Sequence, residues 1–143
     1  MEPILNFMDV ARYLYNKTPN MSNLKLQKMM YFAYLEYYKN CKEELFKNEF
    51  EAWVYGPVLP KLYSSFYELF TVSNEDNIKN KEIEKFLDSI IEKYGSMHAF
   101  DLVNKTHEDK AWIEARKGFK KTDPSNVKIT LNIIKKFLPK SEI

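Results

Sequence analysis

The chain has 143 residues, of which 45% are hydrophobic, 15% aromatic and 29% charged, and its formal net charge is +2. A chain of this length is expected to form one compact domain over residues 1–143, with a core that needs no disulfide or metal. The aromatic content excludes a disordered chain, and no apolar run of about 18 residues is present that could span a membrane. The single Cys41 and an N-terminus unlike a secretion signal favour the cytoplasm.

Apolar residues recur at helical spacing along most of the chain, which predicts a mainly α fold of about seven helices. Pro3 suits the first position of the first helix, and Ser22 is a good N-cap for the second. The expected helices cover residues 3–17, 22–40, 60–70, 81–94, a short stretch after Ser96, 111–117 and 124–138.

The helix from Ser22 to about Asn40 is apolar around most of its circumference, so we expect it to be the central helix. Only a narrow strip of this helix is polar, and its members are Lys25, Lys28, Glu36 and Lys39. Phe32 lies inside that strip. We expect a loop to cross the strip and cover Phe32, and a contact with a partner is the alternative.

Residues 50–55 alternate in polarity and are rich in β-forming residues, which predicts one short extended segment. The following Gly56-Pro57-Val58-Leu59-Pro60 predicts a sharp, rigid turn, because the residue before each proline is disfavoured in the helical region. Residues 71–81 are polar and predict a loop.

Signatures of catalysis and of cofactor or metal binding are absent from the sequence, so we expect no enzyme. His98 and His107 lie nine positions apart with no cysteine nearby, which is a poor metal-ligand pattern. We expect His107 to have a structural role, fixing its own turn by side-chain hydrogen bonds. A hydrolase or nucleotide-modifying enzyme that uses His107 is the weakest of the alternatives.

The C-terminal part of the chain is basic. Residues 116–143 hold 8 Lys or Arg and 2 acidic residues. Nucleic acid or an acidic protein could bind there, but a solvated helix face is the default for such a pattern. Because Arg and aromatic residues do not alternate with these lysines on the predicted helix 124–138, recognition of bases is poorly supported.

Three segments together resemble a known family. Residues 24–33 (LKLQKMMYFA), 50–60 (FEAWVYGPVLP) and 102–118, with its Thr-His-Glu and Trp-to-Gly elements, are similar to the signature segments of the SocA-like Panacea domain. The likeness extends in the right order over roughly residues 5–137. The Tyr-Gly-Pro-Val turn is its most specific part.

The resemblance implies a non-enzymatic antitoxin that binds and neutralises a cognate toxin, in at least one member by delivering the toxin to a protease unfoldase. A nucleic-acid-binding regulator that uses the basic C-terminal region is the alternative. Gly56, Thr106, His107 and Trp112 are then structural residues of the signature. The expected partner-binding residues lie in or beside the rigid turn: Phe32, Trp53, Tyr55, Pro57, Pro60, Lys61 and Tyr63.

Overall fold

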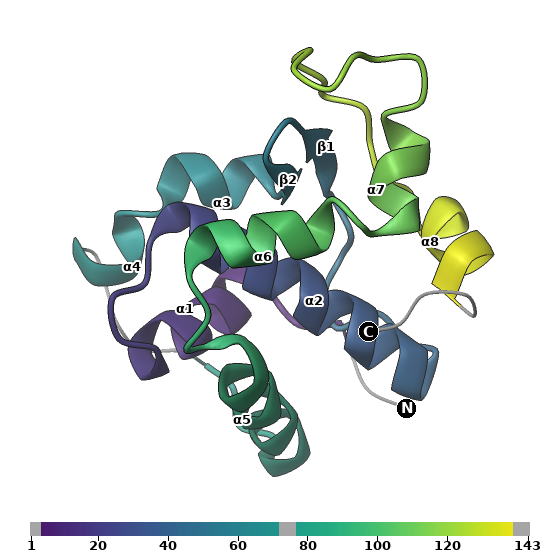
Figure 1. Ribbon diagram of the computed structural model, residues 1–143. Helices are drawn as coiled ribbons and strands as arrows, with labels where there is room; N and C mark the ends of the chain where they lie inside the picture. Colours follow the sequence, from purple (N-terminus) through teal and green to yellow (C-terminus); the bar gives the residue numbers. More distant parts are fainter. Residues whose placement is uncertain (1–3, 72–76, 139–143) are drawn as a thin grey trace.

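The computed structural model describes residues 4–71 and 77–138 and shows a mainly helical fold, as predicted (Figure 1). In the described residues there are eight helices and one β-hairpin. Their bounds are α1 Phe7–Lys17, α2 Asn23–Cys41, β1 Glu51–Trp53, β2 Gly56–Val58, α3 Pro60–Ser65, α4 Glu68–Thr71, α5 Lys81–Tyr94, α6 Ala99–Thr106, α7 Lys110–Ala115 and α8 Leu131–Phe137. None of the described helices is long and apolar enough to cross a membrane.

Helix α2 is the central helix, as its sequence predicts. It begins at the Ser22 cap, whose hydroxyl accepts a hydrogen bond from the Lys25 amide at 3.1 Å. Its neighbours are α1, α3, α5, α6 and β2 (Figure 1). Because partners surround it, α2 buries 13 of its 19 residues.

Two of the four residues in the expected polar strip of α2 are buried, while Glu36 is half-buried and Lys39 exposed. Lys28 is completely buried and Lys25 is 8% exposed. The prediction that a loop crosses Phe32 is wrong, because a helix end covers it instead. The Phe32 ring is 3% exposed and stacks on Tyr94, the last residue of α5, with ring centroids 4.9 Å apart.

Several helix ends differ from their predictions. α1 begins after Asn6, whose side chain accepts a hydrogen bond from the Met8 amide, and the predicted start at Pro3 lies outside the described residues. The predicted helix 60–70 is divided into α3 and α4, and Phe66 at the division packs edge-on against Tyr15. Within the predicted loop 71–81, Thr71 ends α4, residues 72–76 lie outside the described residues, and α5 begins after the Asn80 cap.

The last helix begins later than predicted, because residues before it pair with the hairpin. The Val127 carbonyl accepts the Ala52 amide at 2.8 Å, and the Ile129 amide donates to the Phe50 carbonyl at 2.9 Å. This pairing holds the segment extended, so Asp123-Pro124 does not start a helix. Thr130 caps α8 instead. Its predicted stop at Pro139 lies outside the described residues.

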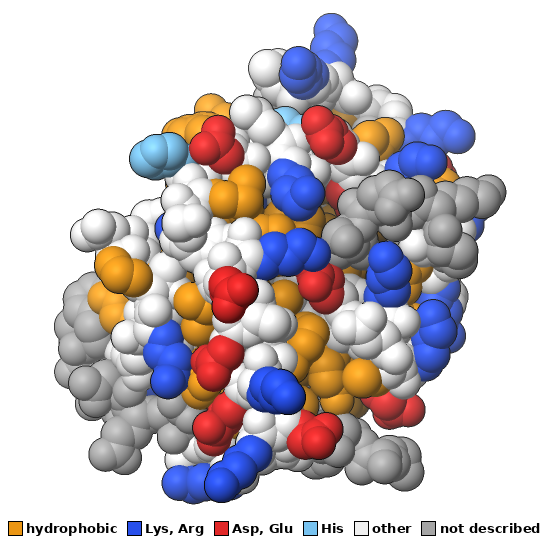
Figure 2. Space-filling model, turned by 60° about the horizontal axis from the view of Figure 1, so that its bottom comes forward, with side chains coloured by type: hydrophobic (Ala, Val, Ile, Leu, Met, Phe, Trp, Pro, Cys, Tyr) orange, Lys and Arg blue, Asp and Glu red, His pale blue; other side chains and the backbone are white. Residues whose placement is uncertain are grey.

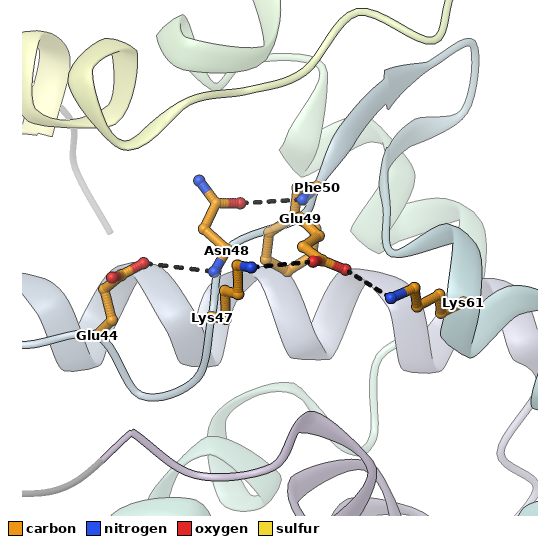
Figure 3. A network of polar contacts seen from close by, with 6 residues as sticks. All are labelled: Glu44, Lys47, Asn48, Glu49, Phe50 and Lys61. Carbon is orange, nitrogen blue, oxygen red and sulfur yellow. Dashed lines mark hydrogen bonds and ion pairs between the residues drawn. The ribbon is translucent and has the colours of Figure 1, made fainter.

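The loop between α2 and β1 is ordered by polar contacts (Figure 3). The Asn48 side-chain oxygen accepts the Phe50 amide at 3.0 Å, and the Asn48 side-chain nitrogen donates to the Ile129 carbonyl at 2.8 Å. Glu49 lies 3.8 Å from Lys47 and 3.9 Å from Lys61. Both contacts are drawn in Figure 3. These contacts fix the entry to the hairpin from both sides.

Candidate functional site

The predicted extended segment and rigid turn together form a tight β-hairpin. Register pairs Glu51 with Val58, Ala52 with Pro57 and Trp53 with Gly56, so Val54 and Tyr55 make a two-residue loop. The strand prediction for residues 50–55 therefore needs correcting, because 54 and 55 turn and 56–58 form the second strand.

The sequence Gly-Pro is compatible with this hairpin for geometric reasons. The Ala52 amide points away from β2, toward Val127, so Ala52 and Pro57 form a pair without mutual hydrogen bonds. A proline is tolerated at such a position, because no ladder bond needs its missing N–H. Gly56 has φ of +107°, a conformation that residues with a side chain rarely adopt.

Side chains from outside the hairpin hold several of its backbone groups. Arg116 Nη1 donates to the Ala52 carbonyl at 3.0 Å, and Trp112 Nε1 donates to the Trp53 carbonyl at 2.9 Å. Lys28 Nζ donates to the Pro57 carbonyl at 2.9 Å. The Leu59 amide just beyond β2 donates to Gln27 Oε1 at 2.8 Å. Helices α2 and α7 thus fix the hairpin through side chains, where a larger sheet would use further strands.

His107 is a further side chain that holds the hairpin backbone, and it does so in a way that its neighbours in the sequence do not suggest. We expected its side chain to fix the turn in which it lies. Instead, its Nε2 lies 2.9 Å from the Val54 carbonyl, and its ring stacks on Trp112 with centroids 4.4 Å apart. Because a carbonyl oxygen can only accept, Nε2 carries the proton. Burial lowers the pKa of His107, and nearby cations lower it further against the opposing effect of the Val54 hydrogen bond.

A partly buried pair of side chains sets the position of α7. The Tyr31 hydroxyl donates to Asp109 Oδ2 at 2.6 Å, and the same oxygen accepts the Trp112 amide at 3.0 Å as the N-cap of α7. Burial raises the pKa of Asp109, and hydrogen bonds from the Tyr31 hydroxyl and from the Trp112 and Ala111 amides oppose that rise. The pair ties α7, and with it Trp112, to the central helix.

Lys28 is the least expected member of the site. It is completely buried, and no carboxylate within the part of the chain that the structure describes lies at ion-pair distance from it. Removal from water lowers its pKa from 10.5 to about 7. Its ammonium lies beside the hydrogen atoms of Gly56, since a Cβ built on Gly56 would come within 3.3 Å of Lys28 Nζ.

A groove of about 790 Å³ opens beside the hairpin. Its lining is mainly apolar and comes from α2, the hairpin, α3 and the segment after α7; it includes Leu24, Lys28, Trp53, Tyr55, Tyr63 and Phe119. Tyr55 is 57% exposed and Tyr63 49% exposed. A groove of this size, with apolar walls and few polar groups, is the common form of a binding site.

The predicted partner-binding residues do not all reach the surface. Trp53 and Tyr63 meet in the groove with ring centroids 5.2 Å apart, and Tyr55 lies on the rim. Lys61 is exposed beside Glu49, and Pro60 is half-buried. Pro57 and Phe32 are buried and are removed from the predicted surface.

Sequence reasoning missed Lys28, Gln27, Phe119 and Arg116 as parts of the site. Arg116 is 5% exposed, and besides Ala52 it donates to the carbonyls of Lys120 at 3.0 Å and Asp123 at 2.6 Å. One signal was available. The chain has only two arginines among its many lysines, and a planar guanidinium can serve several carbonyls where an ammonium cannot.

We expect Arg116→Lys to destabilise the fold by about 2 kcal/mol, because it strands at least one buried carbonyl that the guanidinium now satisfies. Urea unfolding at constant pH measures the loss. Lys117→Ala, at the exposed neighbouring position, is the control and should change the unfolding free energy by less than about 0.5 kcal/mol. An equal effect of the two substitutions would contradict the structural role of Arg116.

Two comparisons with known proteins find relatives. A family model described as Antitoxin SocA-like, Panacea domain, matches residues 26–113. The protein named Antitoxin SocA from Caulobacter vibrioides (strain NA1000 / CB15N) is 37% identical over 65 residues, which are 46% of this chain and 32% of SocA. The chain therefore spans about a third of the length of this curated relative. No solved structure matches the chain.

Proposed function

The chain belongs to the SocA-like Panacea family of antitoxins, and from this membership we propose that it neutralises a toxin by binding it directly. We place the binding surface at the hairpin groove, defined as the groove lined by Leu24, Lys28, Trp53, Tyr55, Tyr63 and Phe119. The observation that carries this placement is a rigid hairpin that presents aromatic side chains beside an apolar groove.

Rigidity supports a binding role. Aromatic anchors contribute most to an interface when they bury large areas and lose little conformational entropy. Trp53 is held by its own indole, which donates to Glu51 Oε1 at 2.9 Å, and by contact with Tyr63. The backbone below it is fixed by Trp112 and Arg116. A partner that docks here meets a surface that is already ordered, which lowers the entropic cost of binding.

Polar groups near the groove support binding over catalysis. Three polar side chains donate to carbonyls of the hairpin and are engaged there: His107, Lys28 and Arg116. A general base or nucleophile must instead reach a substrate. Side chains that are engaged within the fold in this way agree with a protein that binds a partner, as the antitoxin family suggests.

Co-expression with the product of the neighbouring gene tests the proposal. That product should arrest growth alone, and growth should return when this chain is present. We expect Tyr55→Ala/Tyr63→Ala to weaken rescue and to lower affinity about 30-fold, as loss of interface anchors does. Tyr67→Ala is the matched control, because Tyr67 is also 57% exposed but does not line the groove.

The same cells also distinguish direct blocking from delivery to a protease. If the chain blocks the toxin, the toxin should accumulate in a stable complex. If the chain is an adaptor, the half-life of the toxin should fall when the chain is present, and deletion of the unfoldase should restore toxicity. If the chain neither rescues growth nor co-purifies with any neighbouring product, it is not an antitoxin of this kind.

A further inference from the structure

The segment after α7 gives the hairpin groove a basic rim. Residues 116–130 contain five Lys or Arg and one acidic residue. Arg116 is buried and faces backbone carbonyls, but Lys117, Lys120 and Lys121 are exposed. Between them Phe119 is 41% exposed and lines the groove. Apolar surface and positive charge therefore lie side by side on this rim.

A buried lysine amino group also lies in the groove wall. Lys28 lines the groove and has no acidic partner within the described residues. Desolvation is the main cause of the lowered pKa of His107. Three basic side chains from different segments lower it further: Lys28, Lys121 and Arg116. Basic side chains from three segments therefore gather around His107 at the base of the hairpin.

The two carboxylates near the rim each accept a hydrogen bond from a group of this chain. Glu51 Oε1 accepts the Trp53 indole N–H at 2.9 Å, and Asp123 Oδ2 accepts the Lys120 amide at 2.9 Å. Neither carboxylate forms an ion pair with a rim lysine within the described residues. The rim is left with positive charge that a partner can neutralise.

We propose that the hairpin groove binds an acidic peptide segment of the partner, with an apolar anchor side chain beside Trp53 and Phe119 and carboxylates at the rim lysines. This inference rests on the proposed function in that the partner is the toxin. Complementary charge of this kind would speed association and select against basic partners.

Nucleic acid is also acidic, but the groove suits it less well. Stacking of bases needs open aromatic faces. Trp53 and Tyr63 contact each other with their planes 59° apart, and Tyr55 meets Phe100 edge-on at 87°. The one arginine of the rim segment is buried, so no accessible guanidinium remains there to read a base.

Selection from a displayed library of random dodecapeptides on the purified chain tests the inference without the toxin. We expect the enriched peptides to combine acidic residues with a Leu or aromatic residue, and their binding to weaken as sodium chloride is raised. Lys120→Glu/Lys121→Glu should lower their affinity roughly tenfold or more.

Lys81→Glu/Lys85→Glu is the matched control. Both lysines are exposed on α5, at the opposite end of the molecule from the hairpin (Figure 1). The face that carries α5 has acidic and basic side chains interspersed, as Figure 2 shows, so a charge reversal there is a fair comparison. The control should leave peptide affinity unchanged.

Enrichment of basic or neutral peptides, no enrichment, or equal loss in both charge-reversed variants would overturn the inference. Tight binding of a single-stranded oligothymidylate that the Lys120→Glu/Lys121→Glu variant loses would also overturn it, in favour of nucleic acid. Because the selection uses no toxin, acidic peptides can be selected even where co-expression gives no rescue. The inference and the proposed function therefore fail separately.

Discussion

Gly56→Ala should unfold the hairpin and cost the protein on the order of 3 kcal/mol or more. Gly56 has φ of +107°, which already disfavours any residue with a Cβ. The new Cβ would lie 2.5 Å from Thr106 Oγ1 and 2.9 Å from Lys28 Cε. Both neighbours are buried and Thr106 is held by a 2.7 Å hydrogen bond to the Val103 carbonyl, so neither can move away easily. Thermal or urea unfolding measures the cost.

Gly118→Ala separates backbone strain from crowding. Gly118 has φ of +94° but a Cβ there would meet nothing within 4 Å. Its substitution should therefore cost only the backbone term, about 1–2 kcal/mol. Thr106→Ala added to Gly56→Ala should recover part of the loss, because it removes the closer of the two atoms. Equal costs for the two glycine substitutions, without recovery in the double variant, would contradict the close approach.

The same close approach explains why the signature segments act as one unit. Gly56 and Thr106 lie 50 positions apart in the sequence, yet each occupies space that the other leaves. Lys28, from the helix LKLQKMMYFA, fills the remaining side of Gly56 and holds Pro57. The three segments that resemble the family therefore pack against one another around Gly56, and the hairpin groove opens beside them.

Local patterns predicted the helices well, and tertiary contacts account for most of the errors. Apolar spacing and the Ser22 cap located α2, and Gly95 marks the end of α5. Asp123-Pro124 failed as a helix start, because the chain there pairs with β1 and the Asp123 carboxylate accepts the Lys120 amide. Propensity cannot anticipate a strand partner some 75 positions away in the chain.

The hairpin groove adjoins the segment that the sequence singled out, but several residues of its lining were not predicted. Trp53, Tyr55 and Tyr63 line the hairpin groove, but Phe32 and Pro57 are buried. Helical spacing placed Lys28 in the narrow polar strip of α2 but could not show that it is buried, and lysine is rarely buried without an ion pair. Periodicity reports which residues share a helix face, and it cannot report that a hairpin carbonyl lies opposite one of them.

Stability should increase between pH 7 and pH 9, and Lys28 should be the main cause. The pKa of Lys28 is lowered to about 7 in the folded chain from 10.5, because burial disfavours its charged form. Between these values the unfolded chain binds more protons than the folded chain, so stability rises with pH. Two pH units correspond to about 2–3 kcal/mol for one such group. Below pH 7 both states hold the proton, and the contribution to the slope disappears.

Lys28→Met isolates this group. Methionine has a similar length and no charge, so urea unfolding of the variant should show most of the slope between pH 7 and pH 9 removed, with the small remainder due to Lys25, whose pKa burial also lowers. Loss of the bond to the Pro57 carbonyl costs about 1 kcal/mol, and relief of the buried charge offsets it at neutral pH. Lys85→Met, on the exposed face of α5, should keep the wild-type slope. A slope that survives Lys28→Met intact would mean that the Lys28 ammonium is solvated in the folded protein, and that the hairpin rests on a charged group exposed to water through the groove.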